Sequence, residues 1–179
     1  DPVEGYAGLD NRGTPDVGRL QGYVTVDLNS LFGLLERTRL TFYTIPDTPE
    51  ELLYFAIRHE QSIGSQGTKV ILAGSQSFID SGADLEIFGL ESTGTRLSLE
   101  VQHPLIRSRA ESFYVHGRFD YLNSDEEQLG VETFDDRLRV LRFGGRYYFG
   151  DTLLGKKYGG TNQVGLEFSQ GLKIFGESK

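Results

Sequence analysis

Apolar and polar residues alternate along this chain with a period of two, and no other feature constrains its fold as strongly. After Glu111, apolar side chains occupy every second position except one, at Phe113, Val115, Phe119 and Tyr121. A strand turns successive side chains to opposite faces, so this stretch predicts a strand with one apolar and one wet face. The fold class depends on what covers the apolar face.

The same alternation returns along the chain and divides it into nine predicted strands. They lie within residues 3–10, 20–28, 39–43, 53–60, 68–78, 96–102, 113–121, 141–149 and 164–174. In the segment 68–78 the pattern is weak and selects no face. No segment has a convincing 3.6-residue periodicity, which a helix would need. We therefore predict an all-β, antiparallel fold.

The connections between these segments alternate between two chemical types. One set is polar and often acidic: DNRGTPDVG, PDTPEE, IDSGADLEIFGLESTG and LNSDEEQLGVETFDD. The other set carries apolar residues or glycines: NSLFGLLE, SIGSQG, HPLIRSR and GDTLLGKKYGG. Successive connections of an up-and-down meander lie at opposite ends of the sheet, so this succession predicts that topology. Outer-membrane barrels have long polar outer loops and short periplasmic turns, which predicts that the chain starts on the periplasmic side.

HPLIRSR is predicted to be one of the short turns. Pro104 has no N–H to give to a strand ladder, so we expect it to end a strand. Leu105 and Ile106 would then lie at the inner membrane interface. Arg107 and Arg109 would reach the level of the lipid phosphates.

Composition excludes several classes of protein. The chain has 179 residues, a net charge of −8 and no Cys, so a disulfide scaffold, a thiolate zinc site and a cysteine nucleophile are excluded. An acidic chain without a basic stripe argues against nucleic acid as a partner. No stretch approaches eighteen apolar residues, which excludes a transmembrane helix. A transmembrane barrel remains open, because half of its side chains are wet.

A soluble β-sandwich or lipocalin-like barrel also alternates, with its apolar face turned inward. Three features favour a transmembrane β-barrel instead. The predicted strands are about ten residues long, as a tilted membrane strand requires. The opposite face is heavily charged and carries several tyrosines, which suits a wide wet lumen. Apolar connections occur at only one end.

The charged positions are the candidate functional residues. We predict that they line a hydrated passage: Tyr23, Arg58, Glu60, Arg96, Glu100, His116, Arg118, Asp120, Arg142 and Arg146. For any one of them, an ion pair that braces the wall is an equally open role. The three histidines lie on different predicted strands without metal-type spacing. No glycine-rich stretch precedes a helix that could hold phosphate. We therefore predict no catalytic, cofactor-binding or metal site, and no enzyme.

Several stretches resemble one family in order along nearly the whole chain. YAGLDNRGTPDVGRLQGYVTVDLNSLFG resembles the opening barrel strands of the outer-membrane transporters of two-partner secretion, of the haemolysin secretion/activation type (ShlB, FhaC and HecB). HPLIRSRAES resembles a turn of that family, and DDRLRVLRFGGRYYFGD and GGTNQVGLEFSQGL resemble its next strands. The motif turns are carried by Asp10, Asn11, Arg12, Gly13, Pro104, Arg107 and Arg109.

The resemblance implies an architecture. Residues 1–179 would form about nine strands of a transmembrane barrel of about sixteen. A periplasmic POTRA region and the C-terminal barrel strands would lie outside this chain. The remaining strands, or another chain, would pair the open edges of the sheet.

The resemblance also implies a function. The chain would belong to a pore in the bacterial outer membrane that secretes a partner polypeptide. Its partners would be that polypeptide and the lipid bilayer, without a cofactor and without nucleic acid. Three alternatives stay open: a barrel that anchors a fused enzyme such as a patatin-like lipase, a small barrel acting as an adhesin, and a soluble β-domain that binds a ligand.

Overall fold

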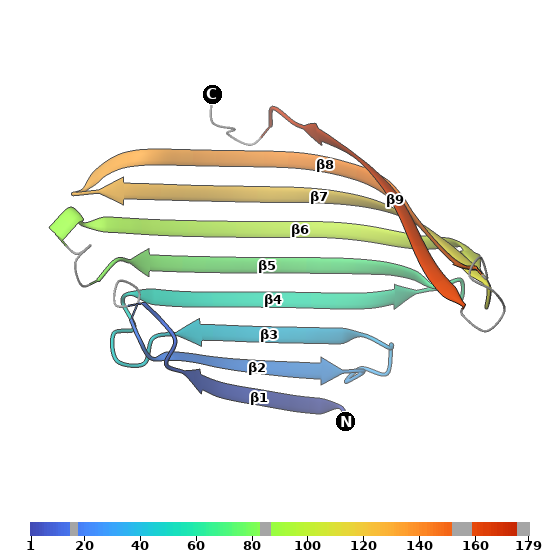
Figure 1. Cartoon of the computed structure of the whole chain (residues 1–179), viewed down its shortest axis with the longest axis horizontal. Coiled ribbons are helices and arrows are strands. Elements are labelled where there is room, and N and C mark those ends of the chain that lie inside the picture. The colour runs from blue at the N-terminus through green and yellow to red at the C-terminus, as the bar shows by residue number, and fades with distance from the viewer. Residues whose placement is uncertain (15–17, 83–86, 152–158, 175–179) are drawn as a thin grey trace.

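The computed structural model describes residues 1–14, 18–82, 87–151 and 159–174. These residues form one antiparallel sheet of nine strands in sequence order, as predicted (Figure 1). The strands are β1 (Val3–Asp10), β2 (Gln21–Asn29), β3 (Arg37–Thr44), β4 (Leu52–Ile63), β5 (Thr68–Asp80), β6 (Leu90–Arg107), β7 (Glu111–Gln128), β8 (Val131–Asp151) and β9 (Gly160–Gly171). Within the described ranges, no helix is long and apolar enough to cross a membrane.

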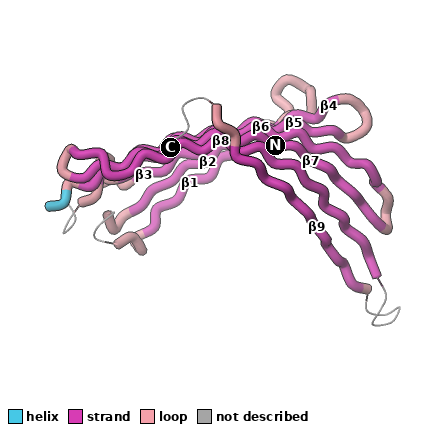
Figure 2. The backbone as a smooth tube through the Cα atoms, turned by 90° about the horizontal axis from the view of Figure 1, so that it is seen from above, coloured by secondary structure: helices cyan, strands magenta, loops and turns pink. Residues whose placement is uncertain are grey.

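The sheet is curved and open. Figure 2 shows it bent like an arch, and Figure 1 shows the two chain ends at its opposite edges. β1 pairs only with β2, and β9 pairs only with β8, so in the described residues each has one unpaired edge. We call the end at which β1 begins the starting end. The turns after β2, β4 and β6 lie there, and the other end is the far end.

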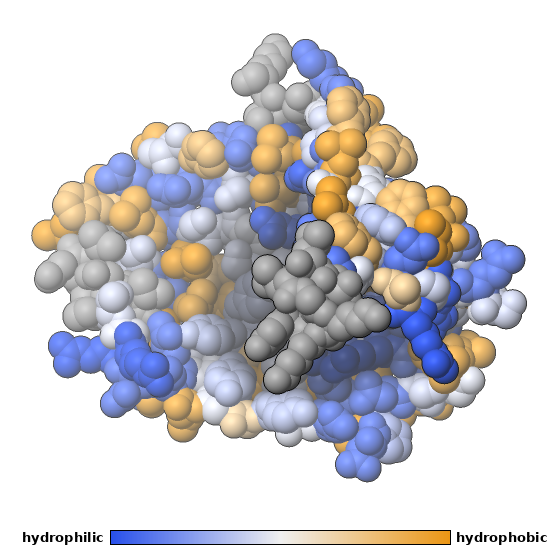
Figure 3. Space-filling view, turned by 45° about the vertical axis from the view of Figure 1, so that its right-hand side comes forward, coloured by the Kyte–Doolittle hydropathy of each residue, from blue (hydrophilic) through white to orange (hydrophobic). Residues whose placement is uncertain are grey.

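The sheet has no second layer packed on it. In the described residues only two hydrophobic side chains are buried, those of Ile45 and Ile71. Phe55 and Phe143 lie on one face and are 48% and 54% exposed. Figure 3 shows orange hydrophobic side chains exposed beside blue hydrophilic ones. The dry centre that a soluble sandwich would require is therefore not formed by these residues.

Pro104 does not end a strand, contrary to the prediction. β6 continues through Pro104 to Arg107, and Pro104 pairs with Tyr114. The register shifts between Pro104 and Ile106, which indicates a β-bulge. A bulge leaves one residue unpaired, so the ladder tolerates a residue without an N–H. The turn itself is shorter than predicted and spans 108–110.

The acidic segment LNSDEEQLGVETFDD is also different from the prediction. It is an extended hairpin of β7 and β8, which turns at Leu129 and Gly130, both with positive φ. Carboxylates face each other across it, at Asp125 and Asp135. Polar composition predicted a loop, but a ladder needs only backbone groups and can continue through polar residues in water.

Two smaller differences concern strand limits. β5 runs to Asp80 and β6 begins at Leu90, so the predicted connection IDSGADLEIFGLESTG is shorter than expected. β9 ends at Gly171, before Leu172 and Ile174, which were predicted within it. The predicted connection GDTLLGKKYGG lies largely outside the described residues.

The turn after β2 is held by a residue that the sequence did not single out. Glu36 is 4% exposed, and its carboxylate accepts the N–H of Phe32 at 2.6 Å and of Leu34 at 2.9 Å. These donors, that of Phe32 first, lower the pKa of Glu36 below its ordinary value. The backbone N–H groups of the turn therefore bind the turn's own carboxylate.

We expect this turn to weaken in acid. A carboxylate whose pKa is lowered by folding stabilises the fold at any pH above its ordinary pKa, and that contribution is lost as the pH falls through the lowered value. The protection factors of the Phe32 and Leu34 amides, which compare each exchange rate with the intrinsic rate at the same pH, should therefore fall in acid. Glu36→Gln should give low protection factors at every pH. Protection factors that stay high in acid in the wild type would contradict the role of Glu36.

Candidate functional site

All ten residues predicted to line a passage lie on the same face of the sheet. Cross-strand partners share a face, and one line of partners crosses six strands: Arg39, Arg58, Ala73, Ser98, Asp120 and Val140. Asp27 on β2 pairs with Arg39 and extends this line. Each of the other predicted residues lies an even number of positions from the residue of its own strand in the line, so it lies on the same face. We call this side the polar face and its opposite the apolar face.

Asp27 is the most tightly held carboxylate of the polar face. It is 1% exposed and accepts two hydrogen bonds from Arg39, from Nε and Nη2, both at 2.8 Å. Arg37 adds a third at 3.2 Å. A bidentate guanidinium and a second arginine fully occupy this carboxylate. Both arginines are about half exposed, so their guanidinium groups contact water while the carboxylate is buried.

Glu60 occupies a similar position one hairpin further along. Lys69 on β5 reaches it at 2.5 Å, and Arg58 on β4 lies 3.9 Å away. Arg37 is its cross-strand partner on β3. The side chains of Arg37, Arg39, Arg58 and Lys69 therefore surround the carboxylates of Asp27 and Glu60.

Asp120 is the centre of a third network. Its Oδ1 accepts from Arg118 at 2.7 Å, and its Oδ2 accepts from Arg142 at 2.9 Å. Arg142 also lies 3.5 Å from Glu167 on β9. The Nε2 atom of His116 is 3.1 Å from that same glutamate. Side chains from β7, β8 and β9 are thereby joined in one network.

His116 belongs to this wall rather than to a reactive centre. Its side chain is 4% exposed, and Gly144 lies directly across from it. A Cβ atom at Gly144 would meet the imidazole at 2.6 Å and the Leu166 carbonyl at 2.7 Å. The glycine is therefore what lets the imidazole lie flat against β8 and reach β9.

Arg96 and Glu100 have no ion pair with any residue that the structure describes. Arg96 lies between two grooves of the polar face, with volumes of about 300 Å³ and about 280 Å³. Arg58, Glu100 and Arg118 line the larger groove with it. An unpaired guanidinium over a groove is available to carboxylates of another molecule.

Tyr23 and Arg146 complete the predicted set. The ring of Tyr23 lies over Gly8, where a Cβ atom would come within 2.5 Å of it. Arg146 lies across from Tyr114, whose ring meets that of Tyr148 edge-on at 6.0 Å. Tyrosine rings therefore lie near both edges of the polar face, on β2 and on β7 and β8.

The predicted motif turns are placed at both ends of the sheet. Asp10 ends β1 and accepts the N–H of Arg12 at 2.8 Å. Gly13 donates to the carbonyl of Arg19 at 3.2 Å, and a Cβ atom there would lie 2.1 Å from the Gly18 carbonyl oxygen. Asn11 lies within this turn. At the starting end, Arg107 closes β6 and Arg109 lies in the exposed turn.

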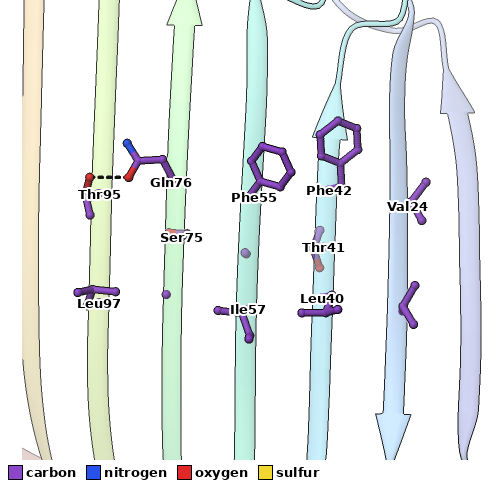
Figure 4. Close-up of a pocket in the computed structure, with 13 residues that line it drawn as sticks. Val24, Leu40, Thr41, Phe42, Phe55, Ile57, Ser75, Gln76, Thr95 and Leu97 are labelled. Carbon is purple, nitrogen blue, oxygen red and sulfur yellow. Dashed lines mark hydrogen bonds between the residues drawn. The ribbon is translucent and has the colours of Figure 1, made fainter.

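The apolar face carries a shallow groove at Gly74 of β5, and Gln76 of the same strand also lines it. Leu40, Phe55, Ile57 and Leu97 surround Gly74, and the groove has a volume of about 510 Å³ (Figure 4). Arg139 also lies on this face, whereas Arg142 lies on the polar face, and the Cζ atom of Arg139 is 3.5 Å from the centre of the Tyr121 ring. Its Nη1 and Nη2 atoms donate to the Leu122 carbonyl and to Asn123.

The sequence predicted which residues lie on the polar face, but it did not predict their ion-pair partners. Asp27, Arg39 and Glu167 were polar positions of predicted strands, but pairing them needs the register between strands. In the described ranges, no group of three or more His, Asp or Glu side chains is placed to hold a metal ion.

Comparisons with known proteins show the fold. No protein-family model matches the chain, and no curated protein sequence matches it. CdiB from Escherichia coli superposes with a TM-score of 0.82 and 22% identity, over 99% of this chain and 33% of that one. CdiB from Acinetobacter baumannii gives 0.59 and 13%, over 94% of this chain and 31% of that one. The chain thus spans about a third of the length of these proteins and has the fold of part of their barrel.

The Asp120 network yields a testable prediction. Asp120→Asn removes one acceptor and brings an amide N–H₂ toward a guanidinium, so we expect a loss of about 2 kcal/mol in the free energy of unfolding. The measurement is urea unfolding of the full-length protein in lipid vesicles. Asp10→Asn is the matched control, because its partner Arg12 is 88% exposed and such pairs contribute roughly 0–1 kcal/mol. Equal effects of the two substitutions would contradict the network.

Proposed function

We propose that this chain is part of a pore in the bacterial outer membrane that secretes a partner polypeptide by two-partner secretion. The observation that carries the proposal is a single-layered sheet with an exposed apolar face and an opposite face of paired charges. Lipid would cover the first face and water the second. The likeness to CdiB proteins, which are two-partner secretion transporters, supports the same reading as the sequence motifs.

The free edges of β1 and β9 support closure by further strands. In hydrocarbon an unpaired backbone N–H or C=O costs several kcal/mol, so only closed barrels cross a membrane as sheets. The chain corresponds to a third of each CdiB chain, which leaves room for the rest of a barrel wall there. We propose that those strands pair both edges, and that the starting end faces the periplasm.

The polar face suits the passage of an unfolded chain. Asp27, Glu60 and Asp120 are each held between two cations of the wall, and each of those cations is 34–54% exposed. The carboxylates are already bonded, and their cationic partners are partly hydrated, so neither group would hold a third group strongly. A polypeptide would therefore pass along the wall without meeting a deep binding site. We propose that the ten predicted residues line this passage.

Two neighbouring residues of β6 test the orientation of the sheet. Leu99 lies on the apolar face and Ser98 on the polar face. Leu99→Arg should cost about 2–4 kcal/mol of folding free energy in lipid vesicles, as a cation does at the midplane of a barrel wall. Ser98→Arg should cost little. If both faces were exposed to water, neither substitution would change the folding free energy much. Such a result in vesicles would contradict the assignment of the apolar face to the membrane.

A pore also predicts conductance. The full-length protein, reconstituted into planar bilayers, should conduct ions, and Ser98→Arg should lower the conductance because it adds bulk and charge to the lumen. Secretion is measured separately, as release of the partner polypeptide into the medium of cells that express both proteins. Bilayers that stay closed, together with a partner retained in the cells, would exclude the transporter function.

A further inference from the structure

Two histidines lie on the apolar face, each bonded to a threonine of the neighbouring strand. The Nδ1 atom of His59 is 2.8 Å from Thr38 Oγ1, and that of His103 is 2.8 Å from Thr68 Oγ1. The Thr38–His59 pair continues a cross-strand line of otherwise apolar residues, from Leu28 on β2 to Leu72 on β5. Polar pairs therefore interrupt the face that we assign to lipid.

These pairs occupy equivalent places in successive hairpins. Thr38 is the second residue of β3 and Thr68 the first of β5, so each follows a turn of the starting end. In the next hairpin Glu111, the first residue of β7, accepts a hydrogen bond from Tyr147 on the same face. We call these three pairs, Thr38–His59, Thr68–His103 and Glu111–Tyr147, the polar row.

The row follows the stagger of the strands. Thr38 is level with Leu72 on β5, which is four residues from Thr68. Thr68 is level with Val115 on β7, because His103 pairs with Val115, and this is four residues from Glu111. A constant stagger accompanies strand tilt in a barrel wall. The row therefore runs along the edge of a tilted wall rather than across its middle.

A second polar pair marks the opposite edge of the apolar band. Thr95 donates to Gln76 at 2.7 Å, eight residues from the Thr68–His103 pair on both β5 and β6. The pairs between them are Val70–Val101, Leu72–Leu99 and Gly74–Leu97. Eight residues span about 26 Å along a strand, and about 20 Å of height at a tilt near 40°, close to the apolar band of such barrels.

The chemistry at this edge suits phosphate. Threonine engages only Nδ1, and in the described residues neither His59 nor His103 has a partner at Nε2. An imidazole that is protonated, or neutral with its proton on Nε2, offers an N–H donor there. Arg109 is exposed in the turn at this end without a carboxylate partner in the same residues. Arg107 pairs with Ser112 and therefore lies on the polar face. The neighbouring carboxylates are occupied, Glu36 by turn amides and Glu111 by Tyr147.

We propose that His59 and His103, oriented by Thr38 and Thr68 and assisted by Arg109, bind the phosphate groups of phospholipids at the starting end of the barrel. The proposal rests on the proposed function, because it requires the apolar face to lie in lipid. It adds a ligand class and two recognition residues to that face. The role of each threonine is to fix the ring and leave Nε2 for the headgroup.

Solid-state NMR can observe this contact directly. The full-length protein, labelled with ¹⁵N-histidine, is placed in phospholipid vesicles in phosphate-free buffer, so that lipid is the only source of ³¹P. The Nε2 signals of His59 and His103, assigned with His59→Gln and His103→Gln variants, should be dephased by phosphorus. His116 is the internal control, because it lies on the polar face against Glu167 and should be unaffected.

The outcomes separate this proposal from the function on which it rests. Undisturbed His59 and His103 signals in a protein that is still sensitive to Leu99→Arg would overturn headgroup binding alone. Dephasing of His116 as strong as theirs would overturn both, because the polar face would then be in contact with lipid.

A folding measurement distinguishes lipid binding from simple stabilisation. The double variant His59→Leu/His103→Leu should lower the folding yield in phospholipid vesicles and not in micelles of an uncharged maltoside, which contain no phosphate. Gln76→Leu/Thr95→Val, at the other edge of the band, is the matched control. An equal loss in both media would mean that the histidines only stabilise the sheet, and would overturn the proposal.

Discussion

The rest of the structure depends on the burial of an apolar sheet face that no described part of the chain covers. The ladder satisfies most backbone groups within the sheet, but it leaves the two edges and one whole face unpartnered. A second layer would solve the problem of the face and not that of the edges. A closed barrel in lipid solves both, because further strands pair the edges and acyl chains cover the face. The fold likeness to a third of a CdiB barrel agrees with that solution.

In the proposed passage, the polar face would carry many charges and still bind a passing polypeptide only weakly. Its central carboxylates are already bonded to arginine or lysine, so a passing cation gains little by approaching them. Its arginines keep part of their surface in water, as Arg39 does while holding Asp27 through two donors. Arg96 differs from these arginines, because it has no ion pair in the described residues and lies between two grooves. In the proposed passage, we expect it to contact acidic residues of a passing chain.

The period of two predicted the nine strands and, except in residues 68–78, their two faces, because side-chain direction in a strand is a local property. It could not predict that Asp27 meets Arg39, or that His116 meets Glu167 across an intervening glycine, since those contacts depend on register. Strand ends were predicted least well. By composition, Pro104 and the acidic residues 122–128 argue against a strand. A β-bulge accommodates the proline, and the ladder continues through the acidic residues because hydrated carboxylates do not disturb its backbone bonds. The alternating chemistry of the connections predicted the up-and-down order of the strands, which periodicity alone leaves open.

The exceptions to the alternation carry information of their own. Polar groups on the apolar face have partners there: Thr95 bonds Gln76, the two histidines bond threonines, and Arg139 covers Tyr121. A buried polar group without a partner would cost several kcal/mol in hydrocarbon, whereas in water the same pairing would gain little. β5 had the weakest pattern because it has exceptions on both faces. Thr68 and Gln76 are polar residues of its apolar face, and Ile71 and Ala73 are apolar residues of its polar face. The weak alternation of residues 68–78 thus reflects these exceptions rather than a strand without a preferred face.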